Sequence, residues 1–142
     1  MKKLLLLAVC CMLFCGCKDK EKEEALEGTW IRNRLEYLGL NVEYLTFEEN
    51  NKFTYKKRLW NWDEKKKSME EGYHIYSGTY KINKNIISLN IINKDTSFEV
   101  KKCELCDTTP PSEKLIIDFN LMKICERDEG LDCKYSYSKD TD

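Results

Sequence analysis

Apolar and polar residues alternate in short runs through most of the chain after residue 25, and this pattern limits the folds open to it. The clearest run is Lys52–Leu59, in which Phe53, Tyr55 and Leu59 share one face. Only Lys57 interrupts that face. A period of two is typical of half-buried β-strands, and no stretch after residue 25 shows the longer period of an amphipathic helix. We therefore expect an all-β domain.

Turn residues separate these runs at short intervals. Asn50-Asn51 and Asn83-Lys84-Asn85 each lie between two runs, which predicts consecutive β-hairpins. Consecutive hairpins favour an antiparallel up-and-down meander, and closure into a barrel of about eight strands removes the exposed edges. The expected strands are Thr29–Tyr37, Val42–Phe47, Lys52–Leu59, His74–Ile82, Ile86–Ile92, Thr96–Lys102, Leu115–Phe119, Leu121–Cys125 and Cys133–Ser138.

Two short segments do not fit the strand pattern. Ala25-Leu26-Glu27 precedes the first strand, and we expect it to form a single turn that plugs one end of the barrel. The charged segment Asp63–Glu71 follows Trp60-Asn61-Trp62, and we expect it to be a short helix or a loop. No repeat or linker interrupts the later sequence, so residues 26–142 are expected to form one domain.

The N-terminus has the pattern of an export signal. Lys2 and Lys3 make a positively charged start, and Leu4–Phe14 is an unbroken apolar run of eleven residues. A helix that spans a bilayer needs about 20 apolar residues, whereas this shorter run suits the hydrophobic region of a signal peptide. We therefore expect residues 1–16 to be a signal peptide.

Leu13-Phe14-Cys15-Gly16-Cys17 resembles the lipobox of bacterial lipoproteins, in which a small residue precedes a cysteine that becomes acylated. Only Cys17 follows a glycine, so it is the expected lipidation site. The resemblance implies a lipid-anchored protein of the bacterial cell envelope, on the outer membrane and facing the periplasm or the surface. Residues 17–25 would then be the lipidated cysteine and a charged, solvated tether. The alternative is a secreted protein cut near Gly16 without a lipid.

Two short motifs carry a second resemblance. Gly28-Thr29-Trp30 resembles the start of the first strand in lipocalins and in bacterial lipocalin-like lipoproteins. Ser77-Gly78-Thr79-Tyr80 resembles a recurrent Gly-Thr-Tyr strand of the bacterial group. The resemblance covers roughly residues 26–138 and implies a barrel whose base is closed by Trp30. No arginine in the last strand is available to cover Trp30, so the resemblance implies an architecture and not a ligand.

An eight-stranded barrel has room inside for its own side chains or for one small ligand. Many residues expected to face inward are aromatic, so they could line an apolar pocket or fill the barrel. Tryptophans at a strand end could also form a rim for a ligand or a protein partner. The ligand-binding candidates are Tyr55, Trp60, Trp62, Tyr76 and Tyr80. The residues expected to face inward are Trp30, Tyr44, Phe53, Tyr55, Tyr76, Tyr80, Phe98, Ile117 and Phe119.

Four cysteines follow Cys17, namely Cys103, Cys106, Cys125 and Cys133. Disulfides persist in exported proteins. The first expectation joins Cys125 to Cys133 across one turn and leaves Cys103 with Cys106. The alternative nests a Cys106–Cys125 bridge inside a Cys103–Cys133 bridge.

Cys103-Glu-Leu-Cys106 also has the spacing of a zinc half-site or of a redox pair. Its thiolates would suit Cu(I) as well. A lipoprotein family linked to copper and envelope stress resembles this chain in joining a lipocalin-like barrel to a Cys-x-x-Cys motif. A metal or redox sensor of envelope stress is therefore an alternative to structural disulfides.

The sequence offers no recognisable catalytic motif. His74 is the only histidine, and we expect it to be a strand residue packed beside Tyr73 and Tyr76. The 24 basic and 25 acidic residues are interspersed, so no basic stripe indicates a nucleic-acid partner. We expect a membrane-anchored, non-enzymatic protein without a cofactor that binds a small hydrophobic ligand or an envelope protein. The further alternative is a filled barrel that inhibits a host or competitor enzyme.

Overall fold

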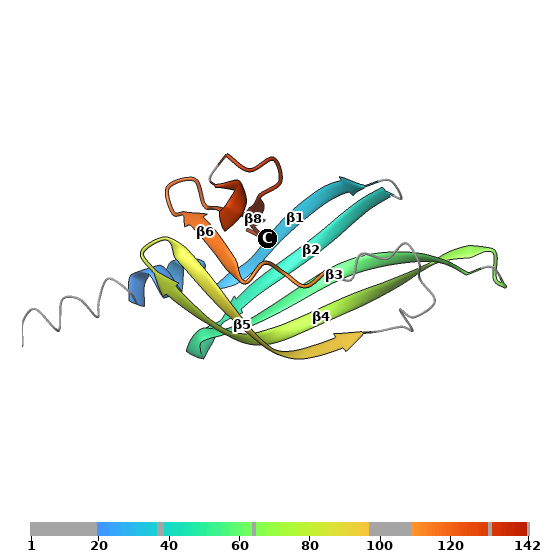
Figure 1. Ribbon diagram of the computed structural model, residues 1–142, viewed down its shortest axis with the longest axis horizontal. Coiled ribbons are helices and arrows are strands. Elements are labelled where there is room, and N and C mark those ends of the chain that lie inside the picture. Colours follow the sequence, from blue (N-terminus) through green and yellow to red (C-terminus); the bar gives the residue numbers. More distant parts are fainter. Residues whose placement is uncertain (1–19, 37–38, 64, 97–108, 131, 142) are drawn as a thin grey trace, which may run out of the picture.

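Eight β-strands form the body of the protein in the computed structural model, which describes residues 20–36, 39–63, 65–96, 109–130 and 132–141. The strands are β1 (Gly28–Glu36), β2 (Gly39–Glu48), β3 (Lys52–Asp63), β4 (Ser68–Asn83), β5 (Ile86–Thr96), β6 (Lys114–Asp118), β7 (Lys123–Glu126) and β8 (Tyr137–Lys139). Each strand pairs antiparallel with its sequence neighbours, and β1 pairs with β8. The sheet is therefore the expected closed, up-and-down, lipocalin-like barrel (Figure 1).

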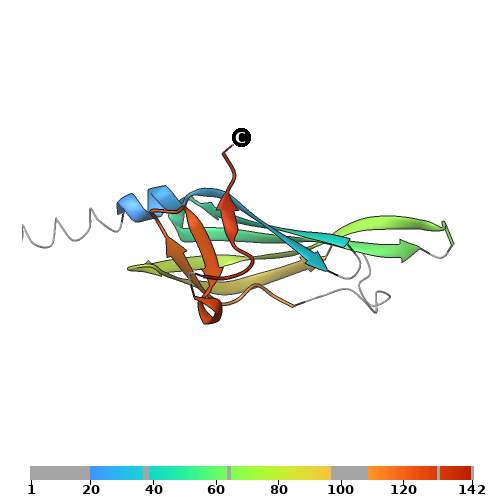
Figure 2. The same cartoon turned by 90° about the horizontal axis from the view of Figure 1, so that it is seen from above.

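A helix of residues 20–26 covers one end of the barrel, which we call the base (Figures 1 and 2). Leu26 is fully buried, and its carbonyl accepts a 2.8 Å hydrogen bond from the indole Nε1 of Trp30. Trp30 is fully buried as well. Lys139 of β8 places its Nζ 5.7 Å from the centre of the Trp30 ring. A lysine of the last strand thus lies over the indole, in place of the arginine that the lipocalin resemblance implies.

The helix extends further toward the N-terminus than expected. Residues 20–24 were expected to be part of a solvated tether, but they are helical. The Asn51 side-chain amide donates a 3.1 Å hydrogen bond to Glu23, and Lys22 donates one of 3.1 Å to the carbonyl of Lys84. The charged segment lies on the barrel because the turns at the base offer it polar partners.

The hairpin of β3 and β4 is longer than expected. The ladder runs without interruption from Lys52↔Thr79 to Asp63↔Ser68. The segment 63–71, expected to be a short helix or a loop, instead contains the end of β3, a turn at residues 65–67 and the start of β4. Cross-strand pairing outweighs the weak helical preference of its Lys and Glu residues.

The later strands differ from expectation mainly in their ends. β5 continues to Thr96, where a separate strand was expected to begin, and residues 97–108 lie outside the described part of the chain. β8 contains only three residues and begins at Tyr137, not at Cys133. A 3-10 turn, Arg127–Glu129, follows β7.

Gly78 lies at a shift of register between β4 and β5. A Cβ atom built on Gly78 would lie 1.9 Å from the backbone oxygen of Asn90. Only glycine allows the two strands to approach this closely. The glycine of the Gly-Thr-Tyr motif is therefore required by the backbone.

The core is one contiguous cluster inside the barrel and over its base. Tyr44 was expected to face inward, but it is only half-buried, and Leu45 contributes to the core in its place. Phe119 packs against the edge of the cluster, and Phe98 lies outside the described residues. The cluster contains Leu26, Trp30, Leu45, Phe47, Phe53, Tyr55, Tyr76, Tyr80, Ile87, Leu89, Leu115, Ile117, Ile124 and Tyr137.

No helix within the described residues is long and apolar enough to cross a membrane.

The burial of Leu26 predicts a large effect of its truncation. We expect Leu26→Ala to lower the free energy of unfolding by about 2–5 kcal/mol, because it leaves a cavity under the helix. Leu121→Ala is a matched control, since Leu121 is 71% exposed. Urea unfolding of both variants tests this, and equal losses would show that the helix does not plug the barrel.

Candidate functional site

A row of polar side chains crosses the barrel interior. It contains one residue from each of β1 to β5, and each residue is the cross-strand partner of the next: Arg32, Glu43, Lys57, His74 and Thr96. The first four are at most 3% exposed. They share the inner face because each lies two positions along its strand from a core residue. We call this set the polar row.

The strongest contact of the polar row joins β1 to β2. Arg32 Nε donates a 2.7 Å hydrogen bond to Glu43 Oε2, and Arg32 Nη2 lies 2.5 Å from the same oxygen. The Tyr137 hydroxyl of β8 donates a 2.9 Å hydrogen bond to that oxygen as well. The guanidinium carbon of Arg32 lies 4.2 Å from the centre of the Tyr137 ring. Arg32, Glu43 and Tyr137 therefore connect three strands.

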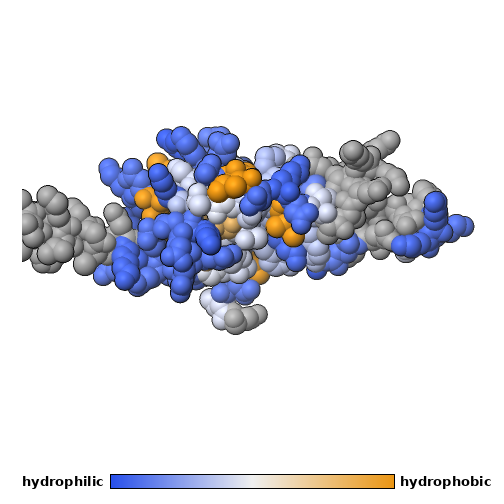
Figure 3. All heavy atoms as spheres, turned by 90° about the horizontal axis from the view of Figure 1, so that it is seen from below, coloured by the Kyte–Doolittle hydropathy of each residue, from blue (hydrophilic) through white to orange (hydrophobic). Residues whose placement is uncertain are grey.

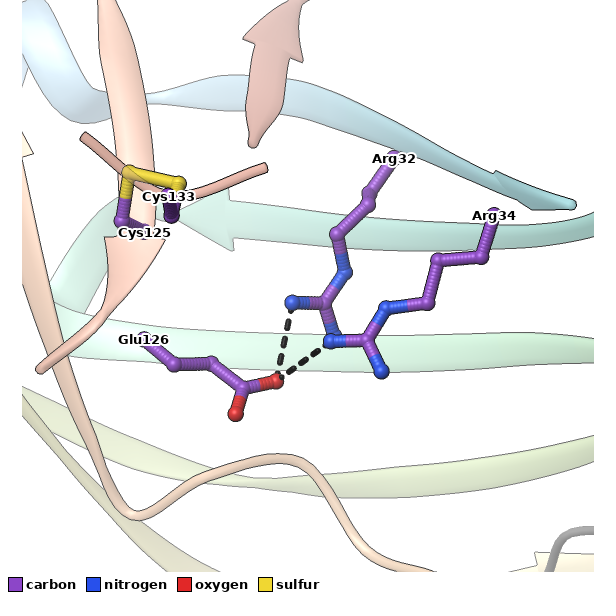
Figure 4. Close-up of a disulfide and its surroundings, with 5 residues drawn as sticks. All are labelled: Arg32, Arg34, Cys125, Glu126 and Cys133. Carbon is purple, nitrogen blue, oxygen red and sulfur yellow. Dashed lines mark hydrogen bonds and ion pairs between the residues drawn. A yellow bond between two sulfur atoms is a disulfide. The ribbon is translucent and has the colours of Figure 1, made fainter. Parts of the chain in front are cut away.

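Glu126 of β7 extends this network. Its Oε1 accepts hydrogen bonds of 2.8 Å from Arg32 and 2.9 Å from Arg34 (Figure 4). The neighbouring residue, Cys125, is bonded to Cys133 on the chain that leads into β8. The short strand β7 is thus attached to β1 by ion pairs and to the segment before β8 by a disulfide.

These contacts reinforce the weakest seam of the barrel. β7 pairs with β8 at two positions, and β8 pairs with β1 at two positions. So few ladder pairs cannot hold a strand by themselves. Arg32 has its donors committed to Glu43 and Glu126, so this half of the polar row acts as a lock between strands.

The pKa shifts of the buried groups agree with the role of Arg32 as a lock between strands. Burial opposes the charge of Arg32, but Tyr137 and Glu43 outweigh it and raise the pKa of Arg32 above its ordinary value. Burial, and next the Glu43 carboxylate, raise the pKa values of Tyr55 and Tyr137 well above 10. Both phenols therefore remain neutral donors at every physiological pH.

The other half of the polar row lies on β3 to β5. His74 Nδ1 is 2.9 Å from the hydroxyl of Thr96, and the His74 ring lies 6.2 Å from that of Tyr76. This confirms that His74 is a strand residue packed beside Tyr76. Tyr73, also expected beside it, lies on the opposite face of β4, where its hydroxyl bonds to Glu71. Lys57 is its neighbour in the row and is 2% exposed. The residue that interrupts the apolar face of Lys52–Leu59 therefore points into the barrel with that face.

Three of the ligand-binding candidates lie in the core. Tyr55, Tyr76 and Tyr80 are 2%, 3% and 2% exposed. Tyr55 lies 6.0 Å from Tyr76, and Tyr80 meets the edge of Phe47 at 4.9 Å, between ring centres. A side chain that lined a roomy cavity would retain accessible surface, so these rings pack against the protein itself.

The other two candidates lie on the projecting hairpin. Trp60 pairs with Glu71 and Trp62 with Met69 along the backbone. The side chains of both tryptophans lie outside the described part of the structure, so their role as a rim stays a prediction. Nothing described brings them together with the three core tyrosines.

The disulfide between Cys125 and Cys133 confirms the first expected pairing and rules out the nested one. Their Cα atoms are 6.0 Å apart. Cys103 and Cys106 lie outside the described residues. Among the residues that are described, no three His, Cys, Asp or Glu side chains are grouped to hold a metal ion.

The outer surface is largely hydrophilic on the face shown in Figure 3, with small separate apolar patches. A groove of about 320 Å³ on the outer wall is lined by Lys52, Thr54, Thr79 and Ile92, among others. Another, of about 550 Å³, is lined by Ile31, Asn33, Tyr135 and Ser138, among others. Both grooves are open at the surface.

The chain matches no protein-family model, and no curated protein and no solved structure is significantly similar to it.

The polar row is the feature that sequence reasoning missed. Part of its signal was present, since Arg32 and Lys57 each lie two positions from a residue expected to face inward. Glu43 was missed because Tyr44, its neighbour on the opposite face, was wrongly expected to point inward. The pattern alone could not show that Arg32 and Glu43 are partners, because this depends on the register between β1 and β2.

We expect Glu43→Gln to destabilise the protein by about 3–5 kcal/mol, because it leaves the buried guanidinium of Arg32 without its main counter-charge. Glu71→Gln removes the partner of Arg58 in an exposed pair of 2.9 Å and should change stability little. Urea unfolding at neutral pH compares the two, and a small effect of Glu43→Gln would refute the lock.

Alkaline pH should weaken the fold through its buried phenols. Burial, followed by Glu23 and Glu27, raises the pKa of Tyr80 to about 12. The unfolded chain releases these phenolic protons near pH 10 while the folded chain keeps them, so the free energy of unfolding should fall as pH rises from 10 to 12. Tyr80→Phe should fall less steeply. Identical slopes in a pH series of denaturant curves would contradict this assignment.

Proposed function

We propose that this protein is a lipid-anchored, non-enzymatic binding protein of the cell envelope that engages a protein partner through the β3–β4 hairpin. The observation that carries the proposal is the position of that hairpin. It projects beyond the ends of β1 and β2, and it does so at the end opposite to the helix of the base (Figures 1 and 2). Cys17, the expected anchor, precedes that helix by three residues.

The projecting part is a two-stranded ribbon in the described structure. β2 pairs with β3 as far as Glu43↔Lys57, whereas β3 pairs with β4 to Asp63↔Ser68. A ribbon of this kind contributes little to the core, and its stability alone would be marginal. Contact with another molecule would be a reason to keep it.

The outer face at the root of the ribbon has the composition of an interface. Arg58 Nε lies 2.9 Å from Glu71 Oε1, and the Tyr73 hydroxyl also bonds to Glu71. Lys56 Nζ lies 3.7 Å from the centre of the Tyr73 ring. Tyrosine and arginine are enriched at the centres of protein interfaces. These side chains are held in place by each other before any partner arrives.

The packed tyrosines favour a protein partner over a small hydrophobic ligand carried inside. An inhibitor of another enzyme would also bind through its surface. An enzyme that this protein inhibits is therefore one kind of partner within the proposal. Native mass spectrometry of the purified protein tests the choice. We expect the mass of the acylated polypeptide alone, starting at Cys17. A stoichiometric small molecule would refute the filled barrel, and an unmodified Cys17 would refute the anchor.

Photo-crosslinking in cells tests the hairpin. A photo-reactive amino acid in place of Arg58 should give a discrete adduct with another envelope protein. The matched control replaces Lys81, which is exposed on β4 near the base. Adducts at neither position, or equally at both, would contradict a contact through the hairpin.

A second candidate function rests on the cysteines. Since Cys125 and Cys133 are bonded to each other, Cys103 and Cys106 are left to pair together or to hold a metal. The second outcome would make the Cys-x-x-Cys segment a metal or redox sensor. Thiol titration and metal analysis of the purified protein decide between them, because the sensor requires free thiols or bound metal.

A further inference from the structure

Three hairpin turns gather beside the helix at the base. Asn51, in the turn between β2 and β3, bonds to Glu23 at 3.1 Å. The carbonyl of Lys84, between β4 and β5, accepts the 3.1 Å hydrogen bond from Lys22. The same Lys22 places its Nζ 6.0 Å from the ring of Phe119, which begins the turn between β6 and β7. The helix and these turns therefore form one end surface.

Leu121 is an exposed apolar residue on this surface. It is 71% exposed, although Phe119 and Met122 on either side of it pack against the core. Asp118 accepts hydrogen bonds of 2.9 and 3.1 Å from the backbone N–H groups of residues 120 and 121. The turn is thus pre-ordered with Leu121 pointing away from the barrel. Exposing a leucine has a cost that contact with an apolar phase would remove.

The length of chain before the helix sets how far this surface can lie from an anchor at Cys17. Residue 20, where the helix begins, is three residue steps along the chain from Cys17. At about 3.3–3.6 Å per residue they span at most roughly 11 Å. The headgroup layer on each side of a bilayer is itself about 5–7 Å thick. An acylated Cys17 would therefore bring the base to within a few ångströms of the headgroups.

The charges of the base suit such a surface. Lys20, Glu21, Glu24 and Lys84 are exposed there and carry both signs. Zwitterionic headgroups also carry both signs, as a phosphate and an ammonium group. The lysines have long apolar stems that can lie along the interface with the charged end in water.

We propose that the base of the barrel is a docking surface for a zwitterionic phospholipid bilayer, with Leu121 inserted at headgroup depth. This rests on the proposed lipid anchor at Cys17 and adds an orientation to it. The twelve residues of β3 rise from the base by up to roughly 40 Å. Docking of the base would thus hold the hairpin tip away from the membrane, toward a partner.

Fluorescence quenching in vesicles tests the proposal. The acylated full chain is reconstituted into phosphatidylcholine vesicles whose acyl chains carry bromine near the headgroup. Leu121→Trp adds a fluorophore at the base, and Ile92→Trp adds one on the barrel wall, where Ile92 is 62% exposed. We expect the emission added at position 121 to be mostly quenched, and that added at position 92 to be retained.

Hydrogen exchange of the unsubstituted protein gives a second measurement. On vesicles, we expect slower exchange at residues 119–122 in the base and unchanged exchange at residues 65–67 in the hairpin tip. A protein that is acylated and floats with vesicles, but shows no selective quenching or slowing at the base, overturns the docking surface alone. A protein whose Cys17 is unmodified and that does not float overturns the anchor and the docking surface together.

Discussion

The buried contact between Arg32, Glu43 and Tyr137 is the interaction on which the closed barrel depends. The last strand has three residues and only two paired positions with each neighbour, so backbone hydrogen bonds alone leave the seam weak. A guanidinium held by a carboxylate at 2.7 Å, with a phenol bound to the same carboxylate, adds strong contacts at a buried position. Glu126 and the Cys125–Cys133 disulfide secure the preceding strand in the same region.

This arrangement divides the interior into two layers with different consequences. The layer toward the base is aromatic and aliphatic, and it is sealed by the helix of residues 20–26. The next layer is the polar row, in which Arg32 has its donors committed to two carboxylates. The interior side chains of this barrel pack against one another or bond to one another, and so stabilise the fold. Outside it, the most prominent features are the projecting hairpin and the end surface at the base.

Much of the barrel was predictable from short-range pattern. The alternation in Lys52–Leu59 identified β3, and Trp30 after a glycine identified the start of the first strand. The candidate site was less predictable. Tyr55, Tyr76 and Tyr80 were correctly expected to face inward, but burial to this degree places them in the core. The length of the hairpin was underestimated because the lysines and glutamates around the turn carry no clear strand pattern, and their pairing is set by the partner strand.

The order of residues was sufficient to predict an all-β barrel and the Cys125–Cys133 pairing, because alternation and closeness along the chain are local properties. It was not sufficient to predict which charges meet. Glu43 lies 11 residues from Arg32, and Glu126 lies 94 residues from it. These pairs exist because strand register and barrel closure bring distant residues to one height in the interior. A shift of one residue in that register would turn each of these side chains to the opposite face, so the folded barrel alone decides that they form a lock.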